Sequence, residues 1–144
     1  MKVSLDNSSA NTIVAYDVGM VRVHARAARD AAEPVAEMRL ITSSTIITPD
    51  TLVENWRADQ PHDLAVSHMQ DVLEFEPEIV ILGTGRQLCF PAREVIEVCH
   101  QAGAGFEVMD TGAACRTYNI LAAEGRRVVA ALLMIEPDSE LPTH

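Results

Sequence analysis

Residues 78–86 read EIVILGTGR and residues 106–116 read FEVMDTGAACR. Each stretch is a short apolar run followed by glycine, a hydroxyl side chain and an arginine. The run at 78–82 is compact and bounded by glycine, which is typical of a strand buried on both faces of a parallel sheet. These two stretches decide the fold class, because parallel strands must be joined by crossover connections, which are usually helices.

Helix patterns flank both strands. A helix is expected to open at Asp63 and to close at Pro77, and a second one carries Pro91 in its first turn and ends at Gly103. Asp110 is expected to cap a third helix that runs through Ala123, and residues 127–135 form a long β-branched strand. The second half therefore alternates α-β-α-β-α-β, which predicts a mostly parallel sheet.

The first half adds β-structure of another kind. Residues 12–16 and 20–24 alternate in hydropathy on either side of Gly19, which favours two strands joined by a glycine turn. Residues 40–48 are rich in Ile and Thr and also favour a strand. We expect this part to be antiparallel. The Ala-rich stretch 25–34 is compatible with a brief helix or a surface loop.

The chain is expected to form one domain. Its length is 144 residues, which suits a single core. We expect that core to span about residues 12–135, with residues 1–10 and 136–144 flexible at the two ends.

Composition restricts the partners and the compartment. The net charge is −10 and the pI is about 4.8, which argues against nucleic acid and against docking on an anionic membrane. No stretch approaches the roughly 20 apolar residues of a membrane span. An odd number of cysteines, 3, and the absence of an apolar leader predict a cytoplasmic protein.

A ligand site is expected where the two decisive strands end, because ligands of open α/β sheets collect beyond the carboxyl ends of parallel strands. Glycines let the backbone approach a ligand closely, and the arginines suit a carboxylate or a phosphate. The candidate ligand-binding residues are Gly83, Thr84, Gly85, Arg86, Asp110, Thr111, Cys115 and Arg116.

The same residues have structural interpretations. Cys115 is either a thiolate favoured by a helix start and by Arg116, or a packed and inert thiol. Arg116, Tyr118 and Asn119 either line the cleft with Arg86 or satisfy buried backbone carbonyls. We predict no catalytic residue, no metal site and no cofactor, because no recognisable ligand spacing or nucleophile motif occurs.

Three motifs together resemble the Mth938-like family, also called DUF498. They are TIITPD…W, ILGTG…FP and EVMDTGAACRTYNILAAEGRRVVAALL, and the resemblance spans roughly residues 18–135. It implies a three-layer α/β fold with a central mixed sheet, and no established enzyme activity. It also implies a pocket near the GTG residues. Eukaryotic members include a mitochondrial factor that assists assembly of respiratory complex I.

We therefore expect a non-enzymatic binding or assembly-type module. The alternative is a protein that binds a small anionic metabolite, or an enzyme acting on one, at the GTG residues. The sequence leaves open a protein partner, a small anion as ligand and a homodimer.

Overall fold

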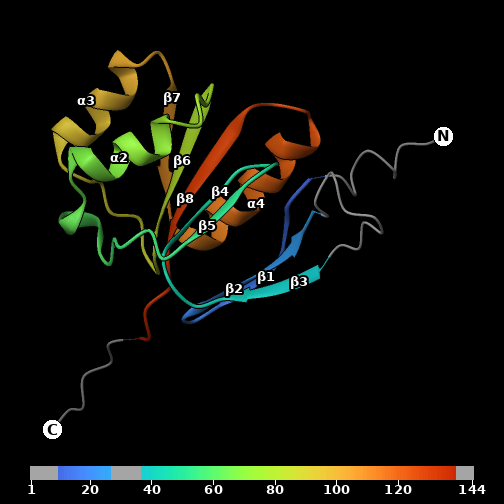
Figure 1. The fold of residues 1–144 in the computed structure, drawn as a ribbon. Helices are drawn as coiled ribbons and strands as arrows, with labels where there is room; N and C mark the ends of the chain where they lie inside the picture. Colours follow the sequence, from blue (N-terminus) through green and yellow to red (C-terminus); the bar gives the residue numbers. More distant parts are fainter. Residues whose placement is uncertain (1–9, 27–36, 139–144) are drawn as a thin grey trace, which may run out of the picture.

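The structure, a computed structural model, describes residues 10–26 and 37–138 (Figure 1). It contains two separate sheets. The smaller is antiparallel, with the order β1 (Thr12–Asp17), β2 (Met20–Ala25) and β3 (Glu37–Ile41). The larger has the order β5 (Leu52–Glu54), β4 (Thr45–Ile47), β8 (Val128–Leu133), β6 (Ile79–Thr84) and β7 (Gly105–Met109). The antiparallel β-structure predicted for the N-terminal half is thus confirmed, and the structure shows in addition that β1, β2 and β3 form a separate sheet.

The larger sheet is mixed, as predicted. Strand β6 pairs in parallel with β7 and with β8, whereas β4 pairs antiparallel with β8 and with β5. The parallel part is built by the expected crossovers, because α3 (Arg93–Gln101) joins β6 to β7 and α4 (Thr111–Ala123) joins β7 to β8. The remaining helices are the short 3₁₀ turn η1 (Pro61–Asp63) and α2 (Val66–Leu73).

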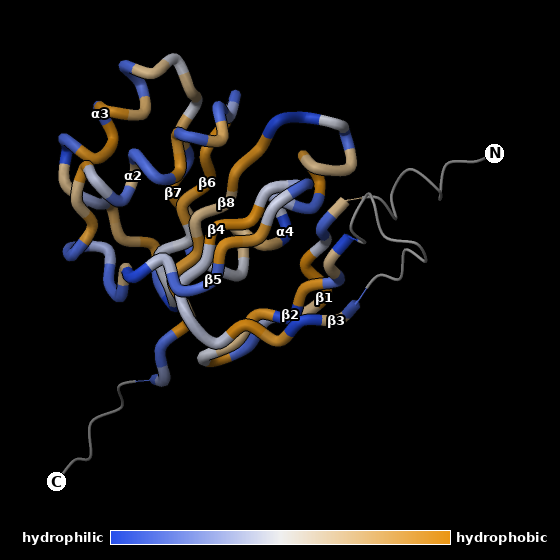
Figure 2. Tube along the Cα trace, in the orientation of Figure 1, coloured by the Kyte–Doolittle hydropathy of each residue, from blue (hydrophilic) through white to orange (hydrophobic). Residues whose placement is uncertain are grey.

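The side chains of the central strands alternate between two cores. Val129, Ala131 and Leu133 of β8 face the cluster that includes α2 and α3, whereas Ala130 and Leu132 face α4 and the smaller sheet. Figure 2 shows the resulting band of apolar residues along β6 and β8. The sheet lies between α2 and α3 on one side and α4 on the other, and β8 is therefore buried on both faces. This arrangement is the predicted three-layer α/β fold.

Several predicted boundaries are wrong, and among them helix α2 ends at Leu73, before the expected stop at Pro77. The helix expected from Asp63 begins at Val66, because the backbone at Ala65 is still extended and its N–H bonds the His68 ring at 3.0 Å. Helix α3 begins at Arg93, so that Pro91 precedes it. The single strand expected over residues 40–48 is two strands, because the chain leaves the smaller sheet and enters the larger one within that stretch.

Parts of three predictions lie outside the described residues. These are most of the Ala-rich stretch 25–34 and most of the two ends expected to be flexible.

Candidate functional site

The two loops expected to form a site do meet at one edge of the sheet. The backbone N–H of Thr111 donates to the carbonyl of Gly85 at 2.9 Å, and the N–H of Gly85 donates to the Thr111 hydroxyl at 2.8 Å. We call residues 83–86 and 110–116 together the GTG edge. Its position follows from the parallel pairing of β6 and β7, which places both carboxyl ends at the same side.

The hydroxyls of the GTG edge are used to build it. Thr111 is fully buried, and its hydroxyl donates to the Leu133 carbonyl at 2.6 Å while accepting from Gly85. Thr84 is also buried, and its hydroxyl donates to the Gln87 carbonyl at 2.6 Å and accepts from the Cys89 N–H at 3.1 Å. Both hydroxyls therefore hold loop backbone in place.

Asp110 and Gly83 also act locally. Asp110 accepts a hydrogen bond from the Ala113 N–H at 2.8 Å and so caps α4, as the sequence predicts. At Gly83 an added Cβ would lie 3.0 Å from Ala114, from Leu132 and from the Thr111 hydroxyl. Glycine therefore allows α4 to pack closely on β6.

The two arginines are bonded by different parts of the chain. The side-chain Nε of Arg86 donates to the carbonyl of Glu136 at 3.1 Å, and the backbone N–H of Arg86 donates to the Glu136 carboxylate at 3.0 Å. Arg116 donates to the hydroxyl of Tyr16, and its guanidinium lies 5.9 Å from the centroid of that ring. Both arginine side chains are exposed, and different segments hold them.

Cys115 is a member of the GTG edge whose side chain lies in the core. Its side chain is buried among the residues that α4 packs against the sheet. Burial raises the pKa of the Cys115 thiol to about 12, and this effect outweighs the lowering by Arg116. The described geometry therefore matches a packed thiol better than a thiolate.

For Tyr118 and Asn119 the interpretation as backbone-satisfying residues is confirmed. The Tyr118 hydroxyl donates to the carbonyl of Asn11 at 2.8 Å. The Asn119 amide accepts from the Ile13 N–H at 2.9 Å and donates to the Ile13 carbonyl at 2.7 Å. One side chain thus makes at Ile13 both bonds that a neighbouring strand would make there, and it covers the free edge of β1 at that residue.

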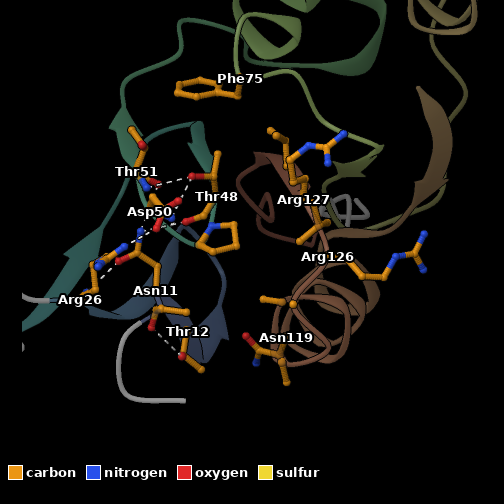
Figure 3. A pocket seen from close by; sticks show the side chains of 17 residues that line it. Asn11, Thr12, Arg26, Thr48, Asp50, Thr51, Phe75, Asn119, Arg126 and Arg127 are labelled. Carbon is orange, nitrogen blue, oxygen red and sulfur yellow. Dashed lines mark hydrogen bonds and ion pairs between the residues drawn. The ribbon is translucent and has the colours of Figure 1, made fainter. Parts of the chain in front are cut away.

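Sequence reasoning missed a cavity of about 680 Å³ near the amino end of β8 (Figure 3). Asn11, Arg26 and Asp50 form one wall and are joined by hydrogen bonds and an ion pair. Arg126 and Arg127 lie across from them, but their guanidinium groups also bond Glu78 and the carbonyl of Glu76. None of the eight predicted residues lines this cavity. Thr48, Asp50 and residues 119–129 of its wall nevertheless belong to two of the motifs that carry the family resemblance.

Residues 10–26 and 37–138 contain no group of three or more His, Cys, Asp or Glu side chains placed to hold a metal ion.

The fold and the GTG edge define a class of protein: a three-layer α/β domain in which the conspicuous loop residues stabilise the junction of two crossovers. The chain belongs to the family described as protein of unknown function DUF498/DUF598, whose model matches residues 13–133. The resemblance seen in the sequence is therefore confirmed.

The similar proteins agree with this assignment. A Bordetella pertussis protein, described as a Mth938-like domain, has a TM-score of 0.69 and 28% identity, covering 90% of this chain and 89% of that one. The mouse protein NADH dehydrogenase [ubiquinone] 1 alpha subcomplex assembly factor 3 is 34% identical over 90 residues, which are 61% of this chain and 48% of that protein.

A third relative is named as a membrane protein. The "13 kDa major membrane protein" of Francisella tularensis subsp. holarctica (strain LVS) is 32% identical over 77 residues, covering 54% of this chain and 63% of that protein. The chain thus spans about half to under two thirds of the length of these two curated relatives. Within residues 10–26 and 37–138, no helix is long and apolar enough to cross a membrane.

Proposed function

We propose that this chain is a non-enzymatic binding protein of the assembly type, and that it recognises a protein partner through residues 87–90. We call these residues the apolar loop. Its Leu88 and Phe90 side chains are 54% and 65% exposed, which is the observation that carries the proposal. Exposed large apolar groups in a fixed loop favour recognition of another protein.

The apolar loop has a defined conformation. The Thr84 hydroxyl bonds the backbone of residues Gln87 and Cys89, and Pro91 is buried where the loop ends. A loop that is already ordered loses little conformational freedom when it binds. Burying Leu88 and Phe90 in a partner's pocket would then contribute on the order of 1–2 kcal/mol each. The partner that fits is a protein with an apolar pocket.

The chemistry of the GTG edge and the relatives support the same class of function. Within the GTG edge, the thiol of Cys115 is buried and the hydroxyls of Thr84 and Thr111 are engaged, so these three groups are not exposed nucleophiles. The exposed thiol of Cys89 lies in the apolar loop. The mouse relative is by name an assembly factor. We extend to this chain the general kind of role, namely contact with other proteins, and not the partner.

The test compares two pairs of apolar residues. Leu88→Ser with Phe90→Ser alters the apolar loop, and Met38→Ser with Leu40→Ser is the matched control, because both control residues are 56% exposed on β3. Each purified variant is used for quantitative affinity capture from cells of the source organism at physiological salt. We expect a protein that the parent chain and the β3 control retain and that the loop variant loses.

Equal retention by the loop variant would refute the proposal. So would light scattering that shows the captured species to be a second copy of this chain.

A further inference from the structure

The C-terminal segment lies over the GTG edge. We call residues 134–138 the strap. In the strap, the carboxylate of Glu136 accepts a hydrogen bond from the backbone N–H of Arg86 at 3.0 Å. The carbonyl of Glu136 accepts a second one from the side-chain Nε of Arg86 at 3.1 Å. Although Glu136 falls in the stretch expected to be flexible, both its side chain and its backbone are recognised by Arg86.

Gly85 makes room for this carboxylate. An added Cβ at Gly85 would lie 2.5 Å from a carboxylate oxygen of Glu136, and the φ of Gly85 is +98°. Any other residue would therefore be strained at this position and would also collide with the carboxylate. The turn that follows β6 thus holds an anionic oxygen in a small cradle. The space is left by the absent side chain of Gly85, and the donor is the backbone N–H of Arg86.

The strap is anchored just before the cradle. Ile135 forms a parallel bridge with Val18, and its carbonyl accepts from the Gly19 N–H at 2.8 Å. This bridge fixes where the strap leaves the sheet and delivers Glu136 to Arg86. Residues 136–138 form no regular structure beyond it, so that Glu136 is held in place mainly by the two bonds to Arg86.

Glu136 uses only part of what Arg86 offers. The Glu136 carboxylate bonds the backbone N–H of Arg86 and not its guanidinium. Within the described residues, the Arg86 guanidinium forms no ion pair with any carboxylate. The guanidinium is a planar fork that binds carboxylates with two parallel hydrogen bonds. A carboxylate arriving from another chain is not tied to Ile135 and can engage both the backbone N–H and this fork.

We propose that Gly85 and Arg86 form a recognition site for an acidic peptide segment of the partner protein, and that Glu136 occupies it as an exchangeable internal ligand. This inference rests on the proposed function and names the chemistry of the partner. A peptide fits better than a free anion because Arg86 binds a backbone carbonyl as well as a carboxylate. An exposed ion pair on its own is also worth little.

The test uses a peptide that copies the strap, Met-Ile-Glu-Pro-Asp, with acetylated and amidated ends. It is titrated into the ¹⁵N-labelled full chain, and the amide signals of Gly85 and Arg86 are followed by NMR. We expect Glu136→Ala to bind the peptide at least about tenfold more tightly than the parent chain, because removing an internal competitor restores the free site. Asp138→Ala is the matched control, since it removes a carboxylate from the same exposed strap, and it should behave like the parent.

Two further arms identify the ligand. A peptide with glutamine in place of its glutamate should bind the Glu136→Ala chain weakly, and so should the intact peptide when Arg86 is also changed to Ala. Equal affinity of the parent and Glu136→Ala, or the absence of saturable shifts, would overturn the inference. Acetate binding as tightly as the peptide would overturn it too, because the site would then serve free carboxylates.

The two proposals fail separately. Loss of peptide binding, with capture of a protein still dependent on Leu88 and Phe90, would remove only the acidic-peptide site. Peptide binding without any loop-dependent capture would instead remove the proposed function.

Discussion

Replacing Thr111 by valine removes one hydroxyl from the centre of the GTG edge and keeps the shape of the side chain. Thr111 is fully buried, and its hydroxyl connects the Gly85 N–H with the Leu133 carbonyl. Each buried polar group left without a partner costs about 1–3 kcal/mol. Because two groups lose a partner and the loop can relax in part, we expect the free energy of unfolding to fall by about 3 kcal/mol.

Thr117→Val is the matched control, because Thr117 lies on the same helix, is half-buried, and makes no side-chain hydrogen bond within the described chain. Its free energy of unfolding should change by no more than about 0.5 kcal/mol. Equilibrium unfolding in guanidinium chloride measures both variants, and an unchanged m-value shows that only stability has changed. If the two variants differ by less than about 1 kcal/mol, the Thr111 hydroxyl does not hold the two loops together.

Asn119→Ala should lower the free energy of unfolding by about 2 kcal/mol, because two backbone groups of Ile13 lose their partner, and hydrogen exchange at the Ile13 amide should accelerate. Unchanged exchange at Ile13 would show that β1 does not need this clamp. Stability should also fall as the pH rises above 9, because the unfolded Cys115 thiol releases its proton near its ordinary pKa of 9.0, whereas burial holds the folded pKa near 12. Urea titrations between pH 7 and pH 10 measure this effect. The free energy of unfolding should fall more for the parent chain than for Cys115→Ala, by on the order of 1 kcal/mol. The same pH dependence in both chains would contradict a buried thiol at Cys115.

The local elements could be predicted because their signals are local. The apolar run before Gly83 and the cap at Asp110 fix β6 and the start of α4 from neighbouring residues alone. Parallel crossovers then bring Gly85 and Thr111 together, which the order of strands and helices was enough to predict. The predicted start of α2 was wrong because the backbone N–H of Ala65 donates to the ring of His68. No simple capping pattern in the sequence predicts that contact.

The roles of the site residues were harder to predict. A threonine or an arginine at a strand end has the same chemistry whether it binds a ligand or the protein's own backbone. For Thr111 the deciding partner is 22 residues away in the sequence, and for Arg86 it is 50 residues away. Glu136 was expected in a flexible tail, because nothing near it in the sequence shows that Gly85 leaves space for its carboxylate.

The order of amino acids by itself determined the alternation of strands and helices, the two-sided burial of β6 and the meeting of two loops at one edge, since each depends on hydropathy, glycine and capping within a few residues. Only the tertiary structure decided which groups of the chain form hydrogen bonds with those loops. A hydrogen bond requires its donor and acceptor to lie within about 3 Å, and in a chain folded through several crossovers that condition is met by segments which the sequence keeps far apart.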